Sequence, residues 1–327
     1  MEQMEQTVQL NIGDVRLIAL YTGDKGYAHC ACKCPCCSQK GVGGNYQGDI
    51  SQVEELLERF TGLEQLYFFG NPDPVIDPEF CNQASKLAIE RGINVCYSTS
   101  GIGGVTTLER LLKGIPPEKV DYISFSIDSV DAEKMKMLKG VAYPWERAIE
   151  GIVWAISNGY TVKIQPTLWS SNYMDAYSII DYFARMGVER FSFHVGSVET
   201  NNLETHQHLT PLQIRAVHEQ IDLATAEHNV HVECPIIYPE CGENNVHKWY
   251  CMNPQECYNW LVFLRKDGVF ATHVPIMSEF DERFCFDITK PISVAKVARG
   301  DSCPLSASTA KRKTLCRYIA KVWKQKP

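Results

Sequence analysis

Cysteines at short spacing are the first chemical feature of this chain of 327 residues. Five of its 14 cysteines lie at residues 30–37, directly after the first apolar run. Thiolates are soft ligands, and several of them on one loop bind zinc or an iron–sulfur cluster. Structural zinc sites usually combine two separate Cys-x-x-Cys pairs. No second pair follows here, because Cys251 and Cys257 are six residues apart and Cys303 and Cys316 are thirteen apart. The thiols therefore indicate a metal or iron–sulfur site, with a zinc-binding protein as an open alternative.

Composition and charge argue against several other classes of function. The formal net charge is −7, and Lys and Arg form no dense run before the C-terminal tail, so the basic face of a duplex nucleic-acid binder is not indicated. No apolar run reaches the ~18 residues that span a bilayer. Residues 1–11 lack the basic and apolar regions of a secretion signal. We therefore expect a cytoplasmic protein that contacts neither nucleic acid nor membrane, and whose clustered thiols bind metal or do redox chemistry.

Alternating strands and helices over the first 195 residues must position these thiols. Apolar runs predict strands at 15–21, 66–69, 93–98, 122–127, 161–168 and 191–195. Apolar residues at helical spacing, often followed by Gly, predict helices at 52–60, 78–91, 106–113, 145–158 and 175–186. This order predicts parallel strands joined by right-handed crossovers, in an open doubly wound sheet or in a full or partial barrel.

The pattern changes after residue 199. Thr210 and Pro211 begin a long helix to about residue 228, and a further strand is expected at 230–232. An irregular segment rich in Cys, Pro and Gly covers 234–257. An Asp-Gly turn then predicts a β-hairpin formed by 260–264 and 269–274, and the basic tail from residue 311 is typical of a solvated amphipathic helix. We therefore divide the chain into a core domain, 1–235, and a C-terminal extension, 236–327.

Three of the clustered cysteines, Cys30, Cys34 and Cys37, are separated by three and then by two residues. This spacing resembles the signature of the radical S-adenosylmethionine (SAM) superfamily. The resemblance implies that the three thiolates bind three irons of a [4Fe–4S] cluster and that SAM chelates the fourth. It further implies that an electron from the cluster cleaves SAM to a 5′-deoxyadenosyl radical. Cys32 and Cys36 are left unassigned, and Cys36 stands where the family commonly has an aromatic residue.

Motifs at later strand ends resemble the same superfamily, in the same order, over about residues 15–195. Asn-Pro-Asp-Pro at 71–74 resembles its Gly-Gly-Glu-Pro motif, 97–101 resembles the end of its third strand, and 123–129 resembles its Ser-Leu-Asp-Gly, followed by Leu-Lys-Gly at 138–140 in place of an Arg-Gly. The implied fold is an α/β partial (β/α)6 TIM-like barrel with a C-terminal extension containing a β-hairpin. The implied cofactor contacts are Asn71, Asp73, Pro74, Ser98, Ser100, Ser126, Asp128 and Gln165.

Each polar strand end also has a structural interpretation. Ser98 and Ser100 are of a type that caps turns, Asp128 could begin the following helix, and Gln165 could be a hydrogen-bonded core amide. In parallel α/β folds, however, ligands bind at the carboxyl ends of the strands, where these residues fall. His194 lies near the end of the sixth strand, so it is a candidate catalytic residue for the same reason.

The C-terminal extension opens like the auxiliary-cluster segment of many radical SAM enzymes. Cys257, Gly268 and His273 follow the opening pattern of that segment, although its third position is normally Cys. The tight run of four cysteines that completes such a segment does not follow. We therefore expect no second cluster, and a hairpin that covers the barrel mouth with His273 and Glu279 toward the substrate.

The resemblance implies an enzyme that abstracts hydrogen, with flavodoxin or ferredoxin as electron donor. The reduced extension favours a small polar, sugar- or nucleoside-like substrate over a peptide. Decarboxylation, dehydration and epimerisation stay open. A decarboxylase-type lyase is preferred, because the chain is loosely similar to cytosylglucuronate decarboxylase-like enzymes of antibiotic pathways. The candidate catalytic residues are His194, Glu199, Cys234 and His273, with Cys234, Cys241 or Cys251 as a possible hydrogen-atom donor. A peptide-modifying radical SAM enzyme and a non-enzymatic zinc-binding α/β protein are the alternatives.

Overall fold

The structure is a computed structural model that describes only part of the chain in detail. The described residues are 7–11, 17–21, 32, 34–35, 49–69, 73–140, 142–195, 206–207 and 209–233, together with the strands at 263–264, 269–271, 285–287 and 294–298. The amphipathic helix expected from residue 311 lies outside these residues.

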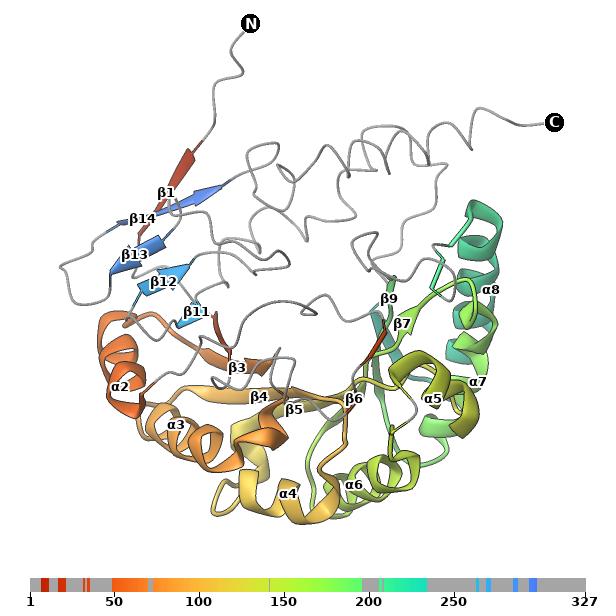
Figure 1. Ribbon diagram of the computed structural model, residues 1–327, viewed down its shortest axis with the longest axis horizontal. Coiled ribbons are helices and arrows are strands. Elements are labelled where there is room, and N and C mark those ends of the chain that lie inside the picture. Colours follow the sequence, from red (N-terminus) through yellow and green to blue (C-terminus); the bar gives the residue numbers. More distant parts are fainter. Residues whose placement is uncertain are drawn as a thin grey trace, which may run out of the picture.

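A curved sheet of seven parallel strands forms the core, with helices along its convex side (Figure 1). The strand order is β10 (His231–Glu233), β8 (Arg190–Ser192), β6 (Val162–Ile164), β5 (Val120–Phe125), β4 (Asn94–Thr99), β3 (Gln65–Phe69) and β2 (Leu17–Tyr21). The helices are α2 (Ile50–Arg59), α3 (Pro78–Glu90), α4 (Gly104–Leu111), α5 (Ala132–Lys139), α6 (Trp145–Ser157), α7 (Ala176–Ala184) and α8 (Pro211–His228). The parallel sheet with its flanking helices confirms the expected α/β fold, and among the described pairings none joins β10 to β2, as in a partial barrel.

The two faces of the sheet differ in polarity, because successive strand residues point to opposite sides. The convex face packs under the helices through side chains that are almost fully buried: Leu66, Phe68, Val95, Tyr97, Ile123, Phe125, Val162, Ile164, Phe191 and Phe193. Burying each Leu or Phe contributes about 2 kcal/mol, so the hydrophobic core lies on this side. The opposite, concave face carries polar side chains in or directly after six strands: Tyr67, Cys96, Ser98, Tyr122, Ser124, Lys163, Gln165, Arg190, Ser192 and Glu233.

Local sequence signals set where the helices begin and end. Asp49 and Gln52 form a capping box at the start of α2, in which each side chain accepts a hydrogen bond from the other residue's backbone N–H. The helix α5, whose bounds the sequence analysis did not give, begins at the cap Asp131 and not at Asp128. It ends before Gly140, whose φ of 109° suits glycine. This stop makes Lys139 the last residue of α5.

The structure differs from the single strand expected at 161–168. β6 ends at Ile164, and a separate short strand, β7 (Thr167–Leu168), pairs with β9 (His194–Val195). The break occurs at Pro166, which has no N–H to donate to a strand ladder. The Pro166 carbonyl instead accepts a hydrogen bond from the His194 N–H at 2.9 Å. Two short strands therefore extend the carboxyl edge of the sheet beyond β6 and β8.

The strands that follow residue 234 form two small antiparallel groups. β11 (Phe263–Leu264) and β12 (Val269–Ala271) form the expected hairpin, and β13 (Cys285–Asp287) adds a third strand. β1 (Thr7–Asn11) pairs with β14 (Val294–Ala298). A segment assigned from sequence to the core domain therefore pairs with one assigned to the extension.

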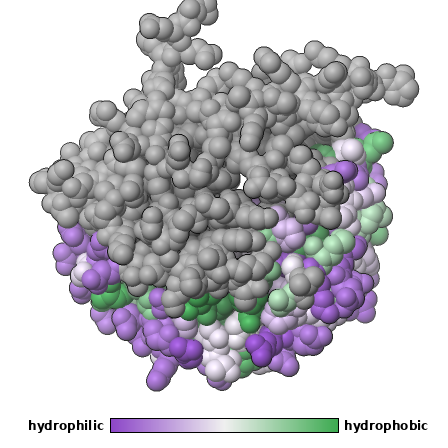
Figure 2. All heavy atoms as spheres, viewed as in Figure 1, coloured by the Kyte–Doolittle hydropathy of each residue, from purple (hydrophilic) through white to green (hydrophobic). Residues whose placement is uncertain are grey.

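The outer surface over the described helices is largely hydrophilic, with small apolar areas between (Figure 2). The large apolar side chains that it exposes are Met137, Val153, Met174, Leu212 and Leu223. Within the described residues, every helix is too short or too polar to cross a membrane.

Candidate active site at the carboxyl edge of the sheet

The described cysteines of the 30–37 loop lie against the end of β4. Cys32 is buried, and its thiol donates to Ser100 Oγ at 3.7 Å. Cys34 is half-buried and packs against the hydrophobic core. The Tyr143 hydroxyl donates to the Ser100 carbonyl at 2.7 Å. Burial raises the Tyr143 pKa, and the charges of Cys32, Asp128, Asp73 and Cys34 raise it further, so these groups surround one hydroxyl.

Asp73 uses its carboxylate to hold the end of β4. Oδ1 accepts from the Thr99 hydroxyl at 2.6 Å and from the Val75 N–H at 3.2 Å. Oδ2 accepts from both the N–H and the hydroxyl of Ser100. Burial raises the pKa of Asp73, and these hydrogen bonds oppose that rise. The Asp73 carboxylate therefore positions Ser100, and Pro74 is buried at the start of the short helix η2 (Pro74–Ile76).

Ser126 and Asp128 meet through a residue outside the predicted set, Lys139. The Lys139 ammonium lies 2.8 Å from Asp128 Oδ2 and donates to Ser126 Oγ at 2.6 Å. Asp128 Oδ1 accepts from the Thr167 N–H at 2.8 Å, and the Asn172 side-chain amide donates to the Asp128 carbonyl at 2.8 Å. The carboxyl edge thus holds a buried cation beside a hydroxyl. Its sequence signal was the Leu-Lys-Gly at 138–140, in place of an Arg-Gly.

Gln165 and His194 lie on the concave side, and the side chain of each has one hydrogen-bond partner among the described residues. The Ser124 hydroxyl donates to Gln165 Oε1 at 2.7 Å, and His194 Nε2 lies 3.3 Å from Ser192 Oγ. Burial lowers the pKa of His194 to about 4, and the positive charge of Lys163 lowers it as well. His194 is therefore neutral at physiological pH and can donate or accept a hydrogen bond. Ser98 lies near the hydroxyl of Tyr67 on the neighbouring strand and lowers the pKa of that group, against the larger raising effect of burial.

Three charged residues of the concave face, Lys163, Arg190 and Glu233, were not identified from sequence. Lys163 Nζ lies 3.6 Å from Glu233 Oε2 and 3.9 Å from the centroid of the Tyr122 ring. Arg190 lies over the same ring, with Cζ 5.5 Å from its centroid. A lysine between two apolar residues, Val162 and Ile164, is the one sequence signal that could have found this group.

The remaining predicted site residues lie outside the described residues. They are Cys30, Cys37, Asn71, Glu199, Cys234 and His273. The structure therefore brings together Cys34, Asp73, Ser100, Ser126 and Asp128 around Tyr143 and Lys139, with Gln165 and His194 on the adjoining concave face.

The described residues fit the two cofactors that the sequence implied. Cys34 offers a half-buried thiol at the carboxyl edge, where it contributes to the charge that Tyr143 experiences. Lys139 and Ser126 offer an ammonium and a hydroxyl side by side, which is the donor set that a carboxylate such as that of SAM requires. Polar groups of this kind at the ends of parallel strands are typical of ligand sites.

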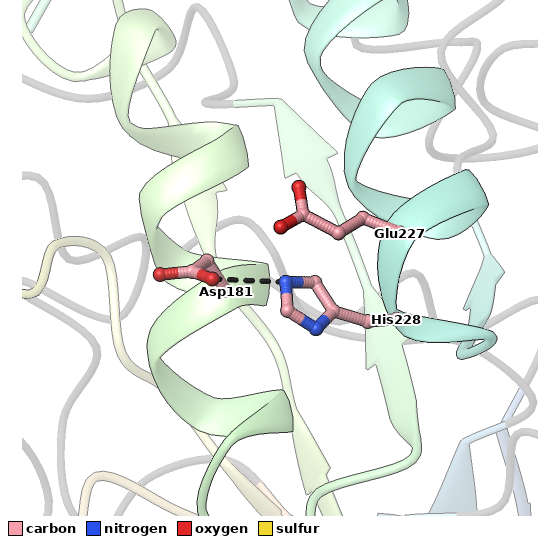
Figure 3. Close-up of side chains that lie close together, drawn as sticks. All are labelled: Asp181, Glu227 and His228. Atoms are coloured by element: carbon pink, nitrogen blue, oxygen red, sulfur yellow. Dashed lines mark hydrogen bonds and ion pairs between the residues drawn. The ribbon is translucent and has the colours of Figure 1, made fainter.

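A second group of possible metal ligands, Asp181, Glu227 and His228, lies away from this edge, between α7 and α8 (Figure 3). His228 Nε2 is 2.9 Å from Asp181 Oδ1, which also accepts from Arg185 Nε at 2.8 Å. Glu227 accepts from the Tyr177 hydroxyl at 2.6 Å. Because these carboxylates already have protein donors, the group is best explained as a polar contact that joins the two helices.

Solved structures of two peptide-bound proteins share this fold. SuiB of Streptococcus suis, bound to precursor peptide SuiA, matches with a TM-score of 0.61 and 15% identity over 80% of this chain. The chain covers about 60% of that SuiB chain. Native anSMEcpe, with bound AdoMet and the Cp18Cys peptide, matches with a TM-score of 0.59 and 12% identity, over 84% of this chain and 78% of its own.

Comparison of the sequence itself points the same way. No curated protein matches it significantly. The model of the radical SAM superfamily matches residues 26–183, the stretch that runs from just before the cysteine loop to α7 and includes the motifs at the ends of β3, β4 and β5. Residues 26–183 therefore form a domain of the radical SAM superfamily, whose members use a [4Fe–4S] cluster and SAM.

Proposed function

We propose that this radical SAM enzyme abstracts hydrogen from a small polar substrate, sugar- or nucleoside-like, bound on the concave face of the sheet. The observation that carries the proposal is the polar lining of that face, which continues from Tyr67 on β3 to Glu233 on β10. The interior of a closed (β/α) barrel is usually filled by branched apolar side chains. A lining of hydroxyl, amide, imidazole and charged groups instead suits a ligand rich in hydrogen-bonding groups.

In this proposal the carboxyl edge holds the cofactors. Cys34, together with Cys30 and Cys37, ligates the cluster, and Lys139 with Ser126 binds the SAM carboxylate. When bound, the cluster supplies the electron that cleaves SAM to a hydrogen-abstracting radical. Asp73 keeps Ser100 and the end of β4 in place beside the cysteine loop, through the hydrogen bonds to Thr99 and Ser100.

The substrate-facing roles fall to the concave face. Gln165, oriented by the Ser124 hydroxyl, and the neutral His194 bind polar groups of the substrate. We assign the same role to Glu199 and His273, and hydrogen-atom return to Cys234. The C-terminal extension covers the substrate, flavodoxin or ferredoxin delivers the electron, and a decarboxylase-type lyase reaction is the one we prefer.

The test is release of 5′-deoxyadenosine from SAM by anaerobically reconstituted protein with dithionite, measured by liquid chromatography and mass spectrometry. We expect release by the wild type and loss in Cys34→Ala. The matched control is Cys81→Ala, which removes a buried cysteine of α3 away from the site. A colourless, zinc-loaded protein with no 5′-deoxyadenosine release would refute the proposal and favour the zinc-binding alternative.

Modification of a peptide is the second candidate function. It is favoured by the fold shared with SuiB bound to precursor peptide SuiA and with anSMEcpe bound to a peptide. The two candidates differ in what stimulates SAM cleavage. A short peptide encoded beside this protein would stimulate it and change mass under the second candidate, whereas nucleoside and uronate substrates would do so under the first.

A further inference from the structure

The concave face holds a largely buried lysine, Lys163, whose ammonium lacks a close acceptor among the described residues. The Lys163 side chain is 9% exposed, and its nearest carboxylate oxygen, Glu233 Oε2, is 3.6 Å away. That separation is longer than a charge-assisted hydrogen bond, which is about 2.7–2.9 Å. The ammonium also lies 3.9 Å from the centroid of the Tyr122 ring. The face of an aromatic ring attracts a cation but does not replace an oxygen acceptor for its N–H groups. A buried lysine normally has its N–H groups satisfied.

Arg190 and Glu233, the other charged residues beside Tyr122, also make only ion-pair contacts longer than a hydrogen bond within the described part of the chain. The Arg190 guanidinium is 4.0 Å from Glu233 Oε1 and lies over the same Tyr122 ring as Lys163. Glu233 also has His231 Nε2 at 3.8 Å, so none of its described charged partners is within hydrogen-bonding distance. The three charged groups therefore face one another across gaps that direct ion pairs would close.

The charges of this group do not balance. Lys163 and Arg190 carry two positive charges, and Glu233 carries one negative charge. The next carboxylate, that of Asp121, accepts hydrogen bonds from Gln65 and Asn94, so its oxygens are already used. His194 adds no further positive charge, because its ring is neutral. Burial lowers the pKa of Lys163, and the nearby Arg190 lowers it further while Glu233 opposes the change. A second anion beside Lys163 and Arg190 would balance their charge and stabilise the protonated form of Lys163.

We propose that Lys163 and Arg190 bind a carboxylate of the substrate, above the Tyr122 ring on the concave face, with Glu233 setting how tightly that carboxylate is held. This inference rests on the proposed function and deepens it, because it names the residues that hold the carboxylate of a sugar- or nucleoside-like acid. The site is separate from the cofactor edge, where Lys139 and Ser126 are assigned to the SAM carboxylate.

The experiment uses a matched pair of probes on the SAM-loaded, cluster-containing protein. Trifluoroacetate carries the carboxylate, and trifluoroacetamide has nearly the same shape without the charge. Binding is followed by fluorine NMR line width. We expect saturable binding of trifluoroacetate and none of trifluoroacetamide. Lys163→Met should weaken trifluoroacetate binding about tenfold or more, because a desolvated charge partner is lost, and Arg190→Met should weaken it less.

Glu233→Gln should change trifluoroacetate binding in the opposite direction to Lys163→Met. Because a misfolded variant would only lose binding, an increase cannot come from misfolding. Removing the competing carboxylate should strengthen trifluoroacetate binding several-fold, since a like charge beside the anion is lost. Lys113→Met, which removes an exposed lysine, should change nothing. Equal binding of both probes, or no response to Lys163→Met and Glu233→Gln, would overturn the inference.

Two outcomes separate this inference from the proposed function. If excess SAM displaces trifluoroacetate, the site takes the cofactor's carboxylate and the substrate assignment is wrong. If the wild type binds trifluoroacetate through Lys163 but releases no 5′-deoxyadenosine, the proposed function fails while the carboxylate site stands. Release of 5′-deoxyadenosine without carboxylate binding would reject the inference alone.

Discussion

The Lys139 ammonium lies 2.8 Å from Asp128 Oδ2, and the two side chains are 9% and 0% exposed. The pair joins the end of α5 to the segment that follows β5. Asp128 extends the connection to β7 through the Thr167 N–H. One buried ion pair therefore fixes three elements at the edge where we propose that SAM binds.

Breaking this pair from one side should be costly. Lys139→Met leaves the Asp128 carboxylate buried without its counter-charge, which typically destabilises a protein by about 3–5 kcal/mol. Urea unfolding at pH 7 measures the loss. The double variant with Asp128→Asn should recover part of the stability, because the uncompensated charge is gone. Lys139→Arg keeps the charge and should retain more SAM affinity than Lys139→Met. Equal SAM dissociation constants for the two would remove Lys139 from the cofactor site.

The cysteines of the 30–37 loop should divide into ligands and a packing residue. Cys34→Ala should lower the iron content and the brown absorbance of the reconstituted protein. Cys32→Ala should keep both, because its thiol is buried against Ser100, and should cost about 1 kcal/mol of stability from the lost packing and hydrogen bond. Iron analysis and thermal unfolding measure the two effects. Loss of iron in Cys32→Ala with retention in Cys34→Ala would reverse the assignment.

Stability should fall in acid partly through His194. Folding lowers its pKa from 6.5 to about 4, so the folded protein favours the neutral ring. The stability that the neutral His194 ring contributes is fully present above pH 6.5. It declines as the pH falls from 6.5 toward 4 and levels off below, with a total loss of about 3 kcal/mol at most. The difference in urea stability between wild type and His194→Gln should shrink over this window. For His231→Gln, which removes an exposed histidine, the difference in urea stability from wild type should not change between pH 6.5 and 4. The same pH dependence in both variants would contradict the prediction.

Much of the fold follows from local sequence patterns, and the misses have physical reasons. Apolar runs and helical spacing predicted the parallel strands and most helices, because each element buries one face. The bounds of α5 were missed since only Met135, Leu138 and the stem of Lys139 are buried in it, too few positions to establish a period. The pairing of β1 with β14 depends on contacts between opposite ends of the chain, which a local pattern does not contain.

The candidate site was predictable only in part for a related reason. Superfamily-like motifs indicated the strand ends, including Asp73, Ser126 and Asp128. Lys163 and Glu233 were missed because a charged residue in a strand usually indicates a solvent-facing position. Curvature of the sheet turns that face inward, and curvature is a property of the whole assembly of strands.

The last prediction concerns whether Asp73 serves the fold or the cofactor. Its carboxylate accepts from Thr99 Oγ1 at 2.6 Å in a buried setting, so Asp73→Asn and Thr99→Val should each destabilise the protein by about 1–3 kcal/mol. Because the two side chains share one hydrogen bond, the double variant should cost less than the sum of the single variants. Asp77→Asn, which weakens a longer 3.3 Å cap contact at α3, should add independently to Thr99→Val. Asp73→Asn with unchanged urea stability but weaker SAM binding would instead show that the carboxylate contacts the cofactor directly.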